Sequence, residues 1–274
     1  MDLNFIKQKM AAMQKTSEGS KGGNKDLFWK PPVGKSQIRI LPSKYDQNNP
    51  FKELFFYYGI DKPVMISPTN FGEKDPIVEF TKQLRSTGDK ENWRLAKKLD
   101  PKMRVFAAVI VRGEEDKGVR LWQFGKEMYM ELLSIADDED YGDYTDIVEG
   151  RDFTVDTVGP EVTGTSYNKS SIRIKPKQTP LSEDESLVKD WLGNQPNPEE
   201  TFKRYTFEEM KTALQKYLSP EAEEDDIIDD EKEPEVEEAP KTNYSLNTSA
   251  KTIKQSKADK FDEMFESDLP FDLE

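Results

Sequence analysis

The sequence predicts an α+β fold with a small β-barrel at its centre and a further segment at each end of the chain. Short apolar and aromatic-rich runs bounded by Gly and Pro have the pattern of β-strands, and segments with helical periodicity stand between them. Such a mixture of short strands and interleaved helices favours the α+β class. Hydrophobic and charged residues each make up 34% of the 274 residues, so we expect part of the chain not to fold.

The strands are predicted from runs of β-branched and aromatic residues. Arg104–Val111 is the strongest of them, and Gly118–Phe124 alternates and follows it after a charged loop, which is the pattern of a hairpin. Phe153–Val158 and Ser171–Lys175 form a second expected pair. The other predicted strands are Ile38–Leu41, Lys52–Ile60 and Val64–Ile66.

The helices are predicted where apolar residues recur every three or four positions. They cover Pro76–Arg85, Glu91–Leu99, Lys126–Ile135, Glu183–Leu192 and Phe207–Leu218. The acidic segment Asp137–Asp146 follows the third of these helices, and such a run is far more often a solvated loop than a Mg²⁺ site.

Three regions follow from these patterns. Residues 1–25 form an arm in which Leu3–Gln14 has helical spacing and Lys15–Lys25 is a flexible linker, residues 26–218 form the core, and residues 219–274 form a disordered acidic tail. The end of the tail interleaves apolar residues with acids, which is the composition of a short motif that binds a protein partner. The apolar residues expected to bind are Phe261, Phe265, Leu269, Phe271 and Leu273.

The net charge of −14 is unevenly distributed along the chain. Residues 1–130 carry 24 Lys and Arg against 16 Asp and Glu, whereas residues 221–274 carry 6 against 19. A basic front half with an acidic tail indicates a surface that binds a polyanion and a tail that competes for that surface. The alternative is that the tail only keeps the protein soluble.

The absence of Cys and His excludes several classes of chemistry. No disulfide, thiol nucleophile, Ser-His-Asp triad or Cys/His zinc site can form. Neither a Walker A loop nor a GxGxxG motif occurs, so we expect a protein that is not an enzyme and holds no metal or other cofactor. No apolar run reaches about 18 residues, and Met1-Asp2-Leu3 opens no signal peptide, so we expect an intracellular protein without a membrane partner.

Basic and aromatic residues are interleaved in the middle of the chain, as in proteins that bind single-stranded nucleic acid. In the strand that ends at Phe124, alternation places Arg120, Trp122 and Phe124 on one face, and we interpret an Arg beside two rings as a platform on which bases stack. The alternative is that the rings belong to the core. The candidate residues are Trp93, Lys97, Lys98, Lys102, Arg104, Phe106, Arg112, Arg120, Trp122 and Phe124.

A second candidate surface lies in the segment Ser166–Lys177. Tyr167 gives it a ring, and an otherwise acidic region has four cations here: Lys169, Arg173, Lys175 and Lys177. The alternative is an ordinary solvated face.

Four stretches resemble the single-stranded DNA-binding, helix-destabilising proteins of T-even-type bacteriophages: Ile38–Lys44 (IRILPSK), Val105–Val111, Val119–Gly125 and Phe202–Leu214. The resemblance implies an OB-fold core that binds single strands cooperatively and without sequence preference. It also implies a role in phage DNA replication, recombination and repair, in the cytoplasm of the infected bacterial host. By position, the family's aromatic residues correspond to Trp93, Phe106, Trp122 and Tyr167, and its basic cluster to Lys97, Lys98, Lys102 and Arg104.

The resemblance also assigns roles to the two ends of the chain. The family's basic arm docks on a neighbouring protomer, which makes Lys7, Lys9, Lys15, Thr16 and Ser17 candidates for cooperativity. The tail would compete with DNA for the binding cleft and would recruit phage replication and recombination proteins.

The family folds a loop around one zinc ion with Cys and His ligands. Here Asp75-Pro76-Ile77-Val78 stands at the Cys-Pro-x-Cys position, so we expect a zinc-free variant with Ile77, Phe80 and Leu84 as an apolar replacement.

Two other functions remain open from the residues alone. A regulator that binds single-stranded RNA could use the same rings and cations, since only a contact to the 2′-hydroxyl separates RNA from DNA. An acidic scaffold that binds only proteins is the second, and it predicts no salt-sensitive DNA binding by the core without its tail.

Overall fold

The computed structural model describes residues 27–218. The predictions for the arm and for the tail, including its apolar motif, lie outside the described residues. None of the helices between residues 27 and 218 combines the length and the apolar character needed to cross a membrane.

The described chain divides into two compact units. The first unit contains the described residues of Met1–Leu54 together with Met103–Phe202, and the second contains Phe55–Lys102 together with the described residues of Lys203–Glu274. The chain therefore passes between the units three times, and each unit is assembled from segments distant in sequence.

The first unit is built on a mixed sheet whose strands run in the order β1-β6-β5-β2-β7-β8. Apart from the parallel pair of β1 and β6, neighbouring strands along this path are antiparallel. The strands are β1 Phe28–Trp29, β2 Gly34–Ile40, β5 Lys102–Val111, β6 Arg120–Phe124, β7 Arg151–Val158 and β8 Lys169–Gln178. The predicted α+β class is confirmed, and the core is OB-like although its sheet is not closed into a barrel within the described residues.

One face of this sheet packs against helix α4 (Lys126–Ala136) to form the larger core of the first unit. Alternate residues of each strand point to this face, so Ile38 and Ile40 meet Phe153 and Val155 of the neighbouring strand. The core is rich in rings, and Tyr144 packs edge-on against Phe153 at 5.0 Å between centroids.

The opposite face of the sheet is partly covered by helix α6 (Glu185–Gly193), whose Trp191 packs with Leu41 and Ile110. The same face carries a buried charge cluster, because the residues of β2 that alternate with Ile38 and Ile40 include Arg39. The remaining short elements of this unit are η3 Glu115–Lys117, α5 Pro160–Thr163 and η4 Pro198–Glu200.

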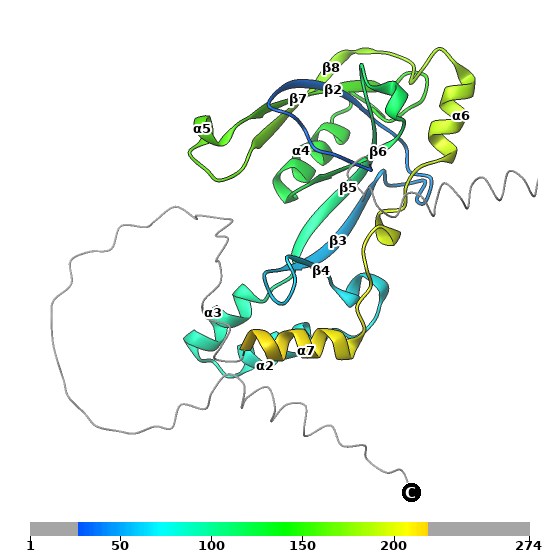
Figure 1. Ribbon diagram of the computed structural model, residues 1–274. Helices are drawn as coiled ribbons and strands as arrows, with labels where there is room; N and C mark the ends of the chain where they lie inside the picture. Colours follow the sequence, from blue (N-terminus) through cyan, green and yellow to red (C-terminus); the bar gives the residue numbers. More distant parts are fainter. Residues whose placement is uncertain (1–26, 219–274) are drawn as a thin grey trace, which may run out of the picture. The chain divides into compact units, whose positions relative to one another are not determined.

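The second unit is mainly helical (Figure 1). Its elements are the end of β3 (Phe51–Tyr58), β4 (Val64–Ile66), η2 (Pro68–Phe71), α2 (Pro76–Ser86), α3 (Lys90–Lys98) and α7 (Phe207–Leu218). The helices bury amphipathic faces against one another, with Phe80, Leu84, Ala96 and Leu214 in a shared core. The predicted helices of this region agree with the observed ones to within a residue or so at each end.

Candidate nucleic-acid interface

Helix α3 presents a row of cations on its solvent side. Asp89 caps the helix by accepting hydrogen bonds from the backbone N–H groups of Glu91 and Asn92 at 2.7 and 3.1 Å. Lys90, Arg94 and Lys98 lie four residues apart, so they form one ridge along the helix. All three side chains are exposed, and none forms an ion pair within residues 27–218.

Trp93 lies beside this ridge, one residue before Arg94 and four before Lys97. Its side chain is 51% exposed, which is unusual for an indole, and the Nζ atom of Lys97 lies 5.8 Å from the centroid of its ring. An exposed ring flanked by cations can stack a base while the ammonium groups approach the phosphates. Lys102, at the start of β5, is also exposed, whereas Arg104 is half-buried and already contacts other residues.

The face shared by Arg120, Trp122 and Phe124 is buried. The exposed fractions are 8%, 2% and 7%, so the interpretation of this face as an exposed stacking platform is corrected: it belongs to the core of the first unit. Trp122 packs edge-on against Trp29 with centroids 5.7 Å apart. The alternation of side chains along the strand correctly placed the three residues on one face. The Arg on that face does not show that it is exposed, because a carboxylate of the same unit pairs with the guanidinium.

That carboxylate is Glu114, whose Oε2 atom accepts a 2.6 Å hydrogen bond from Nη2 of Arg120. The hydrogen bonds from Lys117 and Arg120 lower the pKa of Glu114. The Nε–H of Arg120 is buried without an acceptor within the described residues.

Phe106 and Arg112 also have internal roles. Phe106 is 1% exposed and packs against Phe28 and Phe202, at 6.3 and 5.6 Å between centroids. Arg112 forms a bidentate pair with Asp152 at 3.0 and 3.1 Å and donates from Nη1 to the carbonyl of Leu181 at 2.8 Å. Neither side chain is available to DNA in this structure.

The pair between Arg112 and Asp152 belongs to the buried charge cluster, which consists of Arg39, Arg112 and Asp152. Arg39, 1% exposed, donates from Nε to Asp152 at 2.7 Å and from Nη2 to the carbonyl and the hydroxyl of Thr179 at 2.8 and 2.6 Å. Burial tends to raise the pKa of Asp152, but the hydrogen bond and charge of Arg112 and the charge of Arg39 outweigh it, so this pKa lies below its ordinary value.

A second open surface exists on the hairpin of β7 and β8. Tyr167 is 45% exposed, and Lys169 and Arg173 are exposed without an ion pair within residues 27–218. They lie opposite Val158 and Thr154 of β7, respectively. The second candidate surface is therefore open to solvent.

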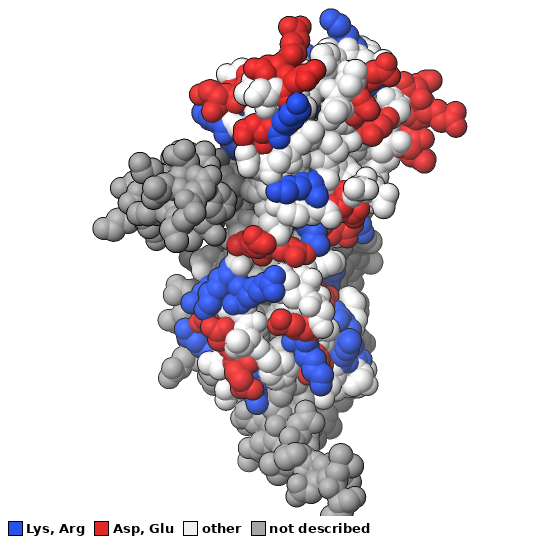
Figure 2. All heavy atoms as spheres, turned by 90° about the vertical axis from the view of Figure 1, so that its right-hand side faces the viewer, with Lys and Arg blue, Asp and Glu red and all other residues white. Residues whose placement is uncertain are grey.

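The two units differ in charge. The described residues of the second unit carry 13 Lys and Arg against 9 Asp and Glu, whereas those of the first carry 16 against 23. Figure 2 shows acidic side chains prominent over the first unit and basic ones gathered over parts of the second. A polyanion is therefore attracted mainly to the second unit.

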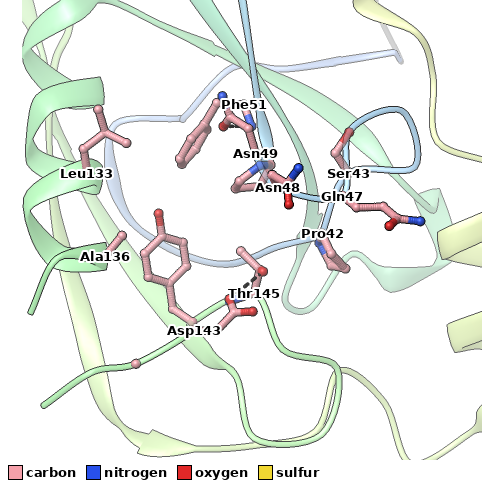
Figure 3. A pocket seen from close by; sticks show the side chains of 13 residues that line it. Pro42, Ser43, Gln47, Asn48, Asn49, Phe51, Leu133, Ala136, Asp143 and Thr145 are labelled. Atoms are coloured by element: carbon pink, nitrogen blue, oxygen red, sulfur yellow. Dashed lines mark hydrogen bonds between the residues drawn. The ribbon is translucent and has the colours of Figure 1, made fainter. Parts of the chain in front are cut away.

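A pocket of about 510 Å³ lies in the first unit between the loop after β2, the end of α4 and the loop before β7 (Figure 3). Its walls include Phe51 and Tyr144 beside neutral amides such as Asn48 and Asn49. The pocket has no Lys or Arg in its walls and one carboxylate, Asp143, so its chemistry does not suit a phosphate.

The residues for which the sequence resemblance raised a zinc site do not fit a metal. Asp75 is 2% exposed, and its carboxylate accepts hydrogen bonds from Tyr57 at 2.9 Å, from Ser67 at 2.5 Å and from the backbone N–H groups of Ile77 and Val78. Residues 27–218 contain no group of three or more possible His, Cys, Asp or Glu ligands. Ile77, Phe80 and Leu84 are buried in the core of the second unit, as expected for an apolar replacement.

Sequence reasoning missed Lys90 and Arg94. Both lie at helical spacing from Lys98, so extending the helical pattern from Trp93 would have placed them on the same surface. It also missed Arg204, for which no local signal exists, because its partner ring lies far away in the sequence.

Comparison with known protein families gives one match. A family described as "gp32 DNA binding protein like" matches residues 33–219, which include β2 to β8 and every helix named above. No curated protein sequence matches the chain.

Proposed function

Because the chain belongs to the gp32 DNA-binding-protein-like family, which covers residues 33–219, we propose that it binds single-stranded DNA without sequence preference. The observation that carries this proposal is the surface of α3, where Trp93 is 51% exposed beside four exposed cations. In this role Trp93 stacks a base, and Lys90, Arg94, Lys97 and Lys98 neutralise phosphates.

The proposal gives each unit a different task. The second unit supplies the cations and the ring on α3, and the hairpin of the first unit supplies Tyr167, Lys169 and Arg173 as further contacts. The buried charge cluster of the first unit holds β2, β5 and β7 together and takes no part in binding. The protein acts by binding and not by catalysis.

The proposal also covers the arm, residues 1–25, and the tail, residues 219–274. The arm links protomers along the strand through Lys7, Lys9, Lys15, Thr16 and Ser17. The tail competes for the basic surface when DNA is absent, and its apolar end recruits replication and recombination proteins in the infected bacterial host. Charge supports the competitor role, since residues 221–274 carry a net charge of −13.

Tryptophan fluorescence during titration with poly(dT) tests the proposal. Trp29, Trp122 and Trp191 are at most 4% exposed, so quenching by stacked bases should come from Trp93. We expect quenching that weakens with salt, is lost in Trp93→Phe and is tighter without residues 219–274. Absence of binding to poly(dT) in gel-shift and fluorescence assays would refute the proposal, and preference for poly(U) would identify an RNA-binding protein instead.

A further inference from the structure

Arg204 stacks on Phe71 in the second unit. The Cζ atom of its guanidinium lies 3.8 Å from the centroid of the Phe71 ring, well inside the range of about 6 Å for a cation–π contact. The Arg204 side chain is exposed, and its N–H groups have no hydrogen-bond acceptor within residues 27–218. Arg204 is therefore fixed by a ring on one face of its guanidinium and is not engaged through its donors.

The ring is itself held by a tight loop. Phe71 ends the short helix η2, which Ser67 caps by accepting from the backbone N–H of Thr69. The side chain of Asn70 bridges to Phe55, accepting from its N–H at 2.8 Å and donating to its carbonyl at 2.9 Å. Gly72 then closes the loop with a φ of 73°, a conformation that favours glycine. Phe71 is thus a rigid support for the guanidinium.

The neighbouring cation is engaged differently. Lys203 pairs with Glu209 at 2.8 Å, and Glu209 also accepts from the backbone N–H of Thr206 at 2.9 Å. Lys203 also lies 4.9 Å from the centroid of Tyr205. The Glu209 carboxylate is therefore engaged by Lys203 and Thr206 and does not pair with Arg204, whose guanidinium stacks on Phe71 instead.

We propose that Arg204, supported by Phe71, is a further contact for single-stranded DNA and stacks an unpaired base on the open face of its guanidinium. The proposal rests on the proposed function and adds a base contact that does not depend on Trp93. A guanidinium is planar and weakly hydrated, and unpaired bases stack on such planes as they do on aromatic rings. A ring that already orients the guanidinium reduces the conformational entropy lost on binding.

The test compares Arg204→Lys with the wild-type full-length protein on two single strands of equal length, oligo(dT) and the same strand with abasic sites. The substitution keeps the charge but removes the plane. We expect affinity for oligo(dT) to fall roughly tenfold and affinity for the abasic strand not to change. Phe71→Leu should act in the same direction because the guanidinium loses its support. Lys189→Gln is the control, since it alters an exposed cation of α6 in the first unit.

The outcomes distinguish a failure of the stacking role of Arg204 from a failure of the proposed binding of single-stranded DNA. An equal loss on both strands would overturn the stacking role and leave Arg204 as a phosphate contact, and no loss on either strand would overturn it as well. Unfolding curves of the variants show whether a loss of affinity is due to misfolding. Among folded variants, both Phe71→Leu and Arg204→Lys have to lose affinity for oligo(dT) but not for the abasic strand if the inference is right. A wild-type protein that binds neither strand would refute the proposed function itself.

Discussion

The two units use the same residue types in opposite ways. In the first unit, Arg39 and Arg112 are held by the buried carboxylate of Asp152, the buried Arg120 pairs with Glu114, and Trp122 lies in the core. In the second unit, Lys90, Arg94 and Lys98 of α3 have no ion pair within the described residues, and Trp93 is half-exposed.

The difference shows what separates a structural from a binding cation. Composition alone gives interleaved basic and aromatic residues in both units, and it favours the stretch of β5 and β6 as strongly as α3. A cation paired with a buried carboxylate contributes to folding, while an exposed cation without a partner keeps its charge for a phosphate. Local pairing and burial therefore separate the two kinds of cation, which interleaved composition cannot do.

The largest expected effect concerns the buried charge cluster. Asp152→Ala leaves Arg39 and Arg112 without their carboxylate, so the free energy of unfolding should fall by about 3–5 kcal/mol. Urea denaturation measures this loss. The control is Asp156→Ala, which removes an exposed pair with Lys35 at 3.9 Å and should cost no more than about 1 kcal/mol. Equal losses in the two variants would show that the cluster has no special structural role.

Two tryptophan substitutions compare the units directly. Trp122→Ala should lower the free energy of unfolding by about 3–5 kcal/mol because it removes a buried ring, and the folded protein should bind oligo(dT) as before. Trp93→Ala should weaken binding by about 1–3 kcal/mol and change stability by less than about 0.5 kcal/mol. Denaturation and fluorescence anisotropy on both variants are the measurements. If Trp122→Ala weakens binding by the folded protein, the stacking role first predicted for Trp122 is restored.

The depressed pKa of Asp152 connects stability to pH. This carboxyl releases its proton more readily in the folded than in the unfolded chain, so its contribution to stability is complete above its ordinary pKa of about 3.9. The contribution is lost as pH falls through the lower folded pKa. Asp152→Asn should therefore be less stable at neutral pH but lose less further stability on acidification. Parallel acid-unfolding curves for variant and wild type would contradict this assignment.

The sequence predicted the positions of helices and strands better than it predicted which side chains are buried. Strand β5 and helices α2 and α3 appear close to their predicted positions because hydrophobic periodicity is a local property. The burial of Trp122 was not predictable in the same way, since it depends on which face of the sheet α4 covers. The division into two units was also hidden, because each unit joins segments far apart in the chain.

The string that carried the family resemblance has a structural role. In Ile38–Lys44, Arg39 anchors the charge cluster, and Lys44 donates from Nζ to the carbonyl of Gly193 at 2.6 Å. Gln195 in turn donates to the carbonyl of Pro42 at 2.8 Å. The most specific sequence signal therefore identifies the fold, while the proposed binding surface on α3 lies outside that string.

A smaller effect should appear in the salt dependence of binding. Replacing Lys90, Arg94 and Lys98 by Gln removes three cations from α3, so the slope of log affinity against log salt should become shallower by about 2. Binding isotherms at several salt concentrations give the slope. The matched control replaces three ion-paired lysines of the first unit by Gln and should leave the slope unchanged: Lys52, Lys117 and Lys189. Equal changes in both triple variants would mean that only net charge matters.

The smallest expected effect is that of a metal chelator. A zinc site would make the second unit unfold when the ion is removed, whereas the hydrogen bonds from Tyr57 and Ser67 to Asp75 need no ion. Dialysis against EDTA should therefore leave both the melting temperature and the affinity for oligo(dT) unchanged. Asp75→Ala should lower the free energy of unfolding by about 1–3 kcal/mol, because it leaves the buried hydroxyl groups of Tyr57 and Ser67 without their acceptor. A drop in melting temperature after dialysis would show instead that an ion stabilises this unit, and the α3 surface would then depend on it.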